Sequence, residues 1–314
     1  MENTEGYLLV YFTGEGHHGE QVYFSLSSDG LHWKDLNRGF PVLISEIGDM
    51  GVRDPFILRT QDKNKYYIIA TDLRIEKDHN WERAQFEGSR SIILWESENL
   101  LDWSQPRSVE IGIPGSGCVW APEAIYNRKK DNYLIFWASM VKEDGESEVK
   151  QRIYYSETKN FITFTKAKKY IERENHIIDT TIMEEQGYYY RIAKNESTKN
   201  ITMERGKDLF QDSFEPVPSP ALEEILGVEG PAAFQRKDGS WCLMVDRFVI
   251  NGGYLPMITN RLSEGKFELL EESEFDMGVN KKRHGSVLRL NKSEYTAIKD
   301  RFLHSNLVLN ARNM

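Results

Sequence analysis

DPFILRTQDKNKYYIIATD, residues 54–72, contains the pattern that decides the fold. A short polar motif is followed by an apolar segment, the polar turn DKNK, and a second segment rich in aromatic and β-branched residues. Two such segments separated by a short polar turn are typical of a β-hairpin. The stretch therefore predicts a hairpin whose first strand begins at Asp54.

The same order of motif, strand, turn and aromatic-rich strand recurs along the chain. The copies are APEAIYNRKKDNYLIFWAS (121–139), IDTTIMEEQGYYYRIAKNE (178–196), EGPAAFQRKDGSWCLMVDR (229–247) and the shorter HGSVLRLNKSEY (284–295). Strands of a second type lie between them: VYFSLSSDGLHW (22–33), IILWESENLLDW (92–103), RIYYSETKNFITF (152–164), NITMERGKDLF (200–210) and MITNRLSEGKF (257–267). Five copies of a four-stranded unit predict an all-β fold, a five-bladed β-propeller with loops of variable length. An open β-sandwich with decorated loops is the alternative.

The last copy is incomplete. Its single strand SVLRL (286–290) is followed by the helix-like SEYTAIKDRF (293–302), whereas the strand YLLVYF (7–12) lies unassigned near the N-terminus. We therefore expect the ring to be closed by pairing of these N- and C-terminal strands. Residues 1–314 are then one propeller domain with a short C-terminal helix and tail.

Composition excludes several classes of function. The net charge is −9, so the chain lacks the basic surface that nucleic acids and anionic membranes require.

Cys118 and Cys242 lie in apolar, strand-like segments of different blades, which predicts two buried thiols and no disulfide. The first residues lack a basic segment followed by a cleavage site, and no apolar stretch has membrane-spanning length. We expect a cytoplasmic protein, and the sequence leaves its oligomeric state open.

Acidic residues and one histidine lead the predicted inner strands: Asp54, Glu123, Asp179, Glu229 and His284. Inner strands of a propeller line a central channel, and carboxylates gathered there repel one another. Glycoside hydrolysis needs such a set, because one carboxylate activates water and a carboxylic acid protonates the leaving oxygen. Each acid alone also fits a structural role as a turn former, a cap or a loop charge. Their shared place in the repeat favours a catalytic channel.

The motifs VRDPFI, WAPEAIY, IDTTI, VEGPAAF and RHGSV occur in the order typical of glycoside hydrolase family 43, which the chain resembles over nearly its whole length. The resemblance implies a five-bladed, inverting glycosidase that needs no cofactor for its chemistry. It assigns Asp54 as the general base, Asp179 as the residue that tunes the acid, and Glu229 as the general acid. Two positions differ from the family pattern, since Glu123 stands where many relatives have Asp and Thr180 stands where they have Pro.

The resemblance also bears on metal and substrate binding. In the family, the residue matching His284 often lies beside a hydrated calcium ion or a water, and we leave both alternatives open because calcium prefers oxygen ligands. Sugars are bound by aromatic rings that stack on their faces and by charged side chains that hydrogen-bond to their hydroxyl groups. The predicted substrate contacts are Phe56, Trp120, Glu123, Arg283 and His284. The polar segment 72–90 is expected to lie over one mouth of the channel, with Asp72, Trp81 and Arg90 as rim contacts.

The expected activity is release of terminal α-L-arabinofuranose, with β-D-xylose as a companion, from small oligosaccharides derived from hemicellulose or pectin. The alternatives are another exo-glycosidase, such as a β-xylosidase or β-galactosidase, and a non-catalytic carbohydrate-binding propeller. The RDP motif is shared with five-bladed fructosidases, but the chain contains no EC dipeptide and no segment similar to WMNDPNG. The sequence thus disfavours a fructosidase.

Overall fold

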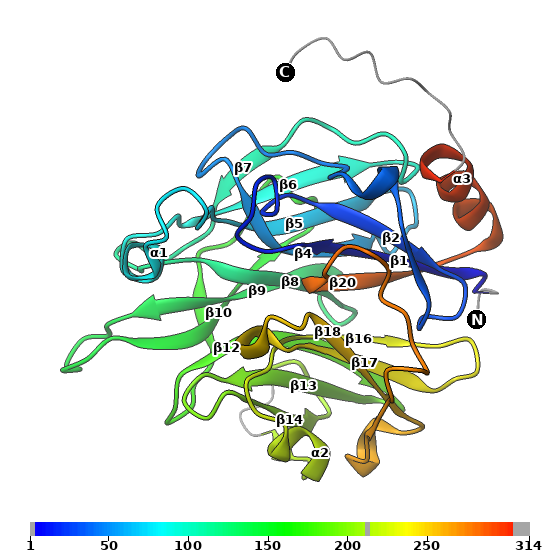
Figure 1. Cartoon of the computed structure of the whole chain (residues 1–314). Coiled ribbons are helices and arrows are strands. Elements are labelled where there is room, and N and C mark those ends of the chain that lie inside the picture. The colour runs from blue at the N-terminus through cyan, green and yellow to red at the C-terminus, as the bar shows by residue number, and fades with distance from the viewer. Residues whose placement is uncertain (1–3, 211–213, 304–314) are drawn as a thin grey trace.

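The computed structural model describes residues 4–210 and 214–303, and it contains five antiparallel sheets of four strands each (Figure 1). The inner strand of each sheet contacts the inner strand of the next, and the last inner strand contacts the first. The sheets therefore form a closed ring. The predicted five-bladed β-propeller is confirmed, and the open sandwich is wrong.

Each blade is a meander of four strands. Blade 1 contains β4 (Val52–Arg59), β5 (Tyr66–Asp72), β6 (Ser91–Ser97) and β7 (Arg107–Glu110). Blade 2 contains β8 (Trp120–Asn127), β9 (Asn132–Val141), β10 (Lys150–Thr158) and β11 (Lys168–Ile171). Blade 3 contains β12 (Ile177–Glu185), β13 (Tyr188–Asn195), β14 (Asn200–Gly206) and β15 (Glu215–Pro216). Blade 4 contains β16 (Glu229–Gln235), β17 (Trp241–Asp246), β18 (Tyr254–Thr259) and β19 (Glu268–Leu269).

Blade 5 joins the two ends of the ring. Its inner strand is β20 (Arg283–Leu290), and its other strands are β1 (Gly6–Phe12), β2 (Tyr23–Ser27) and β3 (Trp33–Asp35). β20 pairs antiparallel with β1, from Gly6 opposite Leu290 to Phe12 opposite Arg283. The predicted closure between residues 7–12 and 286–290 is therefore confirmed.

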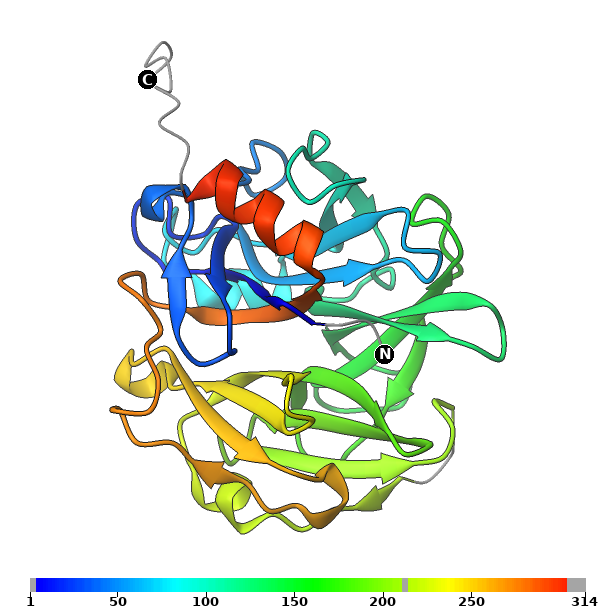
Figure 2. The ribbon, with the colours of Figure 1, turned by 90° about the vertical axis from the view of Figure 1, so that its right-hand side faces the viewer.

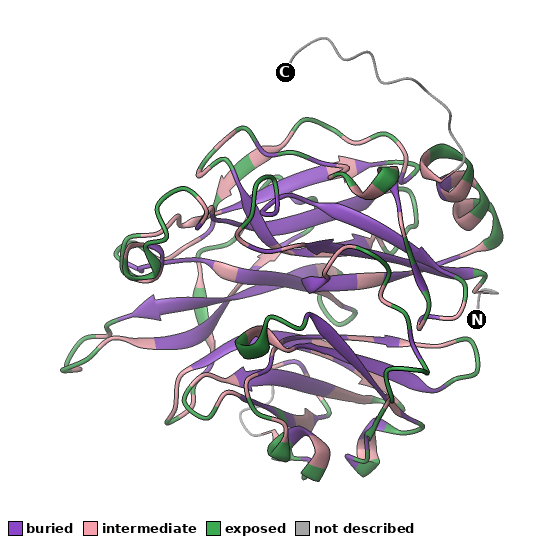
Figure 3. Ribbon diagram, in the orientation of Figure 1, coloured by how far each residue is buried: buried purple, intermediate pink, exposed green. Residues whose placement is uncertain are grey.

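Apolar side chains fill the spaces between neighbouring blades. Separate clusters of buried residues lie at the five blade interfaces, and the strands are mostly buried while the loops are exposed (Figure 3). Cys118 and Cys242 are both buried and unpaired. The core is thus divided among the blade interfaces, which leaves the channel end of each inner strand free to carry polar groups.

Helices are few and peripheral. They are α1 (Trp81–Phe86), α2 (Pro220–Glu224), α3 (Lys292–Phe302) and the short 3₁₀ helices η1 (Asn37–Gly39), η2 (Phe248–Ile250) and η3 (Leu262–Glu264). α3 begins with a capping box at Asn291, and its Ile298 belongs to the buried cluster between blades 5 and 1. The helix lies beside β1 and β20 (Figure 2). The predicted C-terminal tail, residues 304–314, lies outside the described residues. Within 4–210 and 214–303, no helix combines the length and apolarity needed to cross a bilayer.

All five inner strands contain a β-bulge at the same place near their first residues. The bulged pairs are Asp54–Pro55, Ala121–Pro122, Asp179–Thr180, Gly230–Pro231 and His284–Gly285, each opposite a single residue of the neighbouring strand. Proline is tolerated at bulges because a donor is missing from the ladder there. The recurring X-Pro motifs therefore mark the bulges, and Thr180 occupies a proline position of the scaffold.

Candidate active site

The bulges gather the predicted catalytic residues around the channel. Asp54, Asp179 and His284 are the first residues of their bulged pairs, and the Nδ1 atom of His284 lies 3.3 Å from Asp54 Oδ1 and 3.9 Å from Asp179 Oδ1. Asp54 and Asp179 adopt φ values of 51° and 52°, in the left-handed region that aspartate tolerates better than most residues. The backbone at this mouth is therefore shaped to aim side chains at one point.

The structure corrects one detail of the repeat. The five residues that lead the predicted strands do not occupy one equivalent position: Glu229 precedes its bulge, and Glu123 follows its bulge. The position of Glu229 is matched in the other blades by Arg53, Trp120, Ile178 and Arg283. We call the bulge residues the inner set and the residues just before the bulges the outer set.

Asp54 is bound on both carboxylate oxygens. Thr71 donates its hydroxyl to Asp54 Oδ2 at 2.8 Å, and the Ala121 N–H donates to Thr71 Oγ1 at 2.8 Å. Burial alone would raise the pKa of Asp54, but the hydrogen bond from His284, the charges of His284 and Arg53, and the bond from Thr71 hold that pKa below its ordinary value. Asp54 is therefore an ionised carboxylate, as a base that activates water must be.

Asp179 has the opposite electrostatic character. It is buried, and it accepts a hydrogen bond from the Gly230 N–H at 3.0 Å. Burial, together with the negative charge of Glu229, raises the pKa of Asp179 to about 6 against the attraction of His284 and Lys194. Asp179 and Glu229 are thus electrostatically linked, and the linkage disfavours two charges on the pair.

Glu229 is bound between two cations. Arg283 Nη2 donates to Glu229 Oε1 at 2.8 Å, and Lys194 Nζ donates to Glu229 Oε2 at 2.9 Å. Arg283 is fixed in turn by the buried Asp246, whose Oδ2 accepts from Arg283 Nε at 2.8 Å. These contacts set the orientation of the Glu229 carboxyl group. The sequence did not predict Lys194 and Asp246 as site residues, although both belong to the aromatic-rich second strands that pair with the motif strands.

Glu15 links the two arginines of the outer set. Arg53 Nη1 donates to Glu15 Oε1 at 2.6 Å and to Glu20 at 3.0 Å, and Arg283 Nη1 lies 3.3 Å from Glu15 Oε1. Burial would raise the pKa of Glu15, but Arg53 and Arg283 lower it to about 2. Glu15 lies in the loop between β1 and β2, so its role depends on ring closure and has no signal in the local sequence.

His284 and Glu123 occupy the centre of the channel. Burial by itself lowers the pKa of His284, but the charges of Asp179 and Asp54 raise it to about 9. Burial raises the pKa of Glu123 to about 8. Gly230 is required beside them, because a Cβ at that position would lie 2.5 Å from the His284 ring. At neutral pH the channel therefore holds an imidazolium between Asp54 and Asp179.

A calcium ion beside His284 would have to be bound through several oxygen atoms, because calcium prefers oxygen ligands to an imidazole nitrogen. Residues 4–210 and 214–303 contain no cluster of three or more His, Cys, Asp or Glu side chains arranged for a metal. The calcium ion beside His284 stays a prediction, and the chemistry below uses no metal.

The predicted substrate contacts separate into two groups. Arg283, His284 and Glu123 lie in the channel network, as described. Trp120 packs edge-on against Trp81 of α1, with 6.2 Å between ring centroids, and Arg53 lies 5.0 Å above the Trp81 ring. Trp81 is also exposed, so it presents an aromatic surface beside Arg53.

The other proposed contacts have packing or anchoring roles. Phe56 packs against the apolar cluster between blades 1 and 2. Asp72 is buried and accepts hydrogen bonds from the Asp49 N–H and the Ser89 hydroxyl, and Arg90 forms an ion pair with Glu110 at 2.9 Å. Neither Phe56 nor these loop residues gain support as sugar contacts from the geometry.

Comparisons with known proteins agree with this geometry. Residues 2–296 match the family described as Probable glycosyl hydrolase domain, which is related to glycoside hydrolase family 43. An alpha-L-arabinofuranosidase of Bifidobacterium longum subsp. longum is 29% identical over 77% of this chain. The chain spans only 27% of the length of that relative.

Solved structures share the fold. The GH43 protein BlXynB of Bacillus licheniformis superposes with a TM-score of 0.53 and 17% identity over 92% of this chain and 55% of its own. The catalytic domain of the Coprinopsis cinerea GH62 alpha-L-arabinofuranosidase gives a TM-score of 0.51 and 12% identity over 72% of this chain and 70% of its own. The match over residues 2–296 establishes that the chain belongs to the glycosyl hydrolase domains related to glycoside hydrolase family 43, and by family it is a glycosidase.

Proposed function

We propose that this glycosidase releases terminal α-L-arabinofuranose, and β-D-xylose as a companion activity, from short plant-type oligosaccharides. The main support is the meeting of Asp54, Asp179 and Glu229 at one mouth of the channel, around His284 and Arg283. The arabinofuranosidase relative supports the choice of sugar, although it extends far beyond the matched region.

The proposed mechanism is inversion at the anomeric carbon. Asp54 takes a proton from a water molecule as that water attacks, and Glu229 gives a proton to the departing oxygen. Asp179 has the supporting role that the family resemblance assigns to it, and the charge of Glu229 acts on its carboxyl group. Inverting glycosidases keep their two carboxyl groups roughly 6.5–9.5 Å apart to leave room for the water.

A panel of chromogenic aryl glycosides tests the proposed substrate. We expect release from the α-L-arabinofuranoside and, more slowly, from the β-D-xyloside. Activity confined to galactosides or fructosides would contradict the choice of sugar. No hydrolysis of any glycoside, together with binding of oligosaccharides, would instead support the alternative of a non-catalytic carbohydrate-binding propeller.

The stereochemistry is tested separately by NMR of the first-formed sugar. Inversion gives the anomer opposite to that of the substrate before mutarotation equilibrates the two. A product that keeps the configuration of the substrate would exclude Asp54 as the base of an inverting enzyme.

A further inference from the structure

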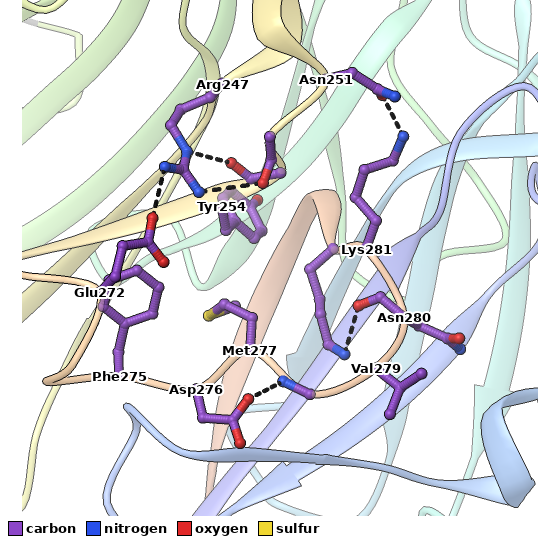
Figure 4. Close-up of a pocket in the computed structure, with 14 residues that line it drawn as sticks. Arg247, Asn251, Tyr254, Glu272, Phe275, Asp276, Met277, Val279, Asn280 and Lys281 are labelled. Atoms are coloured by element: carbon purple, nitrogen blue, oxygen red, sulfur yellow. Dashed lines mark hydrogen bonds and ion pairs between the residues drawn. The ribbon is translucent and has the colours of Figure 1, made fainter.

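A pocket of about 590 Å³ opens at the junction of blades 4 and 5. It lies between loop 247–253, which joins β17 to β18, and segment 272–282, which leads into β20 (Figure 4). Arg247 directly follows Asp246, and Lys282 directly precedes Arg283, so the pocket adjoins the residues that fix Glu229. Its volume falls in the range of about 300–1,000 Å³ that is usual for small-molecule sites.

Lys281 lines this pocket and precedes Arg283 of the catalytic network by two residues. Its Nζ atom donates to Asn251 Oδ1 inside the pocket (Figure 4). On the other side, a Cβ placed on Gly14 would lie 3.6 Å from Lys281 Nζ and 3.7 Å from Arg283 Cδ. Gly14 precedes Glu15, which contacts both Arg53 and Arg283. A ligand that extends from Arg283 into the pocket would therefore pass the Lys281 ammonium group.

The charges of the pocket nearly balance. Arg247 pairs with Glu272 at 3.0 Å, and Lys282 pairs with Asp35. One cation and one anion of the lining, Lys281 and Asp276, have no ion-pair partner within the described parts of the chain. This balance disfavours a strongly charged ligand and leaves both donors and acceptors available.

Apolar groups complete the lining. Met277 lies between the Arg247–Glu272 pair and Lys281, and Val279 is 97% exposed at the rim (Figure 4). A sugar ring presents C–H groups on its faces and hydroxyls, which both donate and accept, at its edge. A lining of mixed donors, acceptors and apolar patches matches that pattern.

We propose that this pocket binds a neutral sugar on the leaving-group side of the scissile bond, and that Lys281 is the residue that recognises it. The proposal rests on the proposed glycosidase function. Arg283 then has two tasks, since it orients Glu229 and borders the path along which the leaving group extends. Lys281 donates to a ring oxygen or hydroxyl of the leaving group after releasing Asn251.

A titration that needs no turnover tests the pocket. Xylotriose is titrated calorimetrically into the Asp54→Asn protein and into the same protein carrying Lys281→Met. Loss of one hydrogen bond from a charged donor should weaken binding about tenfold or more. Lys237→Met, an exposed lysine in the turn at the far end of β16, is the matched control and should leave the affinity unchanged. If the Asp54→Asn protein bound xylotriose equally well with and without Lys281→Met, the proposal would be overturned. Tighter binding of a uronic acid oligosaccharide than of xylotriose would also overturn it.

Kinetics in the active protein give an independent result. Lys281→Met should lower kcat/KM about tenfold for an arabinosylated xylo-oligosaccharide and leave kcat/KM unchanged for an aryl arabinofuranoside. Equal losses on both substrates would place Lys281 in the catalytic network and contradict a leaving-group pocket. If the unaltered protein cleaves neither substrate, the proposed function is wrong, while the titration still decides on the pocket.

Discussion

The two ends of each inner strand differ sharply. At the first residues of each inner strand, which form the catalytic end, a β-bulge interrupts the register, and charged side chains lie in buried surroundings. The inner strands are β4, β8, β12, β16 and β20. At the other end the strands pair regularly, as in Arg59 opposite Tyr66 and Gln235 opposite Trp241. The ion pair of Arg128 with Glu184 at this end lies on the surface. The propeller thus places its chemistry where strand register is interrupted and its stabilising packing where register is kept.

Removing the charge of Asp54 should give the largest loss of activity. Asp54→Asn keeps a side chain that tolerates the left-handed backbone and can still accept from Thr71. Without an ionised base, kcat should fall about 10²–10⁴-fold for every substrate, because each needs an activated water. Turnover assays should show this loss in a protein that remains folded by circular dichroism. Near-normal kcat would contradict the assigned base.

Glu229→Ala should discriminate between leaving groups. Natural sugar linkages need protonation of the departing oxygen, so their kcat should fall about 10²–10⁴-fold. Glycosides with very good leaving groups, such as dinitrophenyl glycosides, should lose far less. Measuring both in one preparation controls for folding, because a misfolded protein loses the two activities equally.

Raising the pH should destabilise the protein through His284. Its folded-state pKa of about 9 exceeds the ordinary 6.5, so the folded state binds a proton more tightly than the unfolded state does. This contribution is complete below pH 6.5 and is lost as the pH rises through 9, at a cost of up to about 3 kcal/mol. Urea unfolding at a series of pH values should show the decline, and His284→Gln should flatten it. A decline that persists in the variant would assign it to other groups.

Glu15→Gln should weaken catalysis moderately and leave the reacting carboxyls in place. The variant removes the charge that links Arg53 to Arg283, so we expect about a tenfold loss of kcat. The alkaline limb of the pH–kcat profile should also move, since Arg283 holds Glu229. A change in stability without any change in this profile would make Glu15 a purely structural residue.

Arg128→Ala, at the regular end of blade 2, should have the smallest effect. The Arg128 side chain is 64% exposed beside Glu184, so the lost ion pair should cost less than about 1 kcal/mol. Activity should equal that of the unaltered protein. A clear loss of kcat would show that the far end of the strands affects the catalytic end.

The sequence predicted the fold, and it placed the candidate carboxyl groups near the start of the inner strands, for a physical reason. Hairpins are local, so strand, turn and strand appear in consecutive residues, and the X-Pro motifs recur because every bulge has the same geometry. Lys194, Asp246 and Glu15 were missed because they reach the site across strands or across the ring closure. Phe56 stays a predicted sugar contact, although it packs against the apolar cluster between blades 1 and 2, because proximity in sequence to Asp54 does not specify on which side of a bulged strand a side chain packs.

The pairing of β1 with β20 also has a consequence for biosynthesis. A ribosome makes β1, β2 and β3 about 250 residues before it makes β20, so during that time the inner edge of the first three strands has no partner. Blades 1 to 4 can fold as they emerge, but His284 and Arg283 arrive only with the final strand. A nascent chain therefore acquires its central imidazolium and the arginine that holds Glu229 in a single late step, so that activity appears only when the ring is complete.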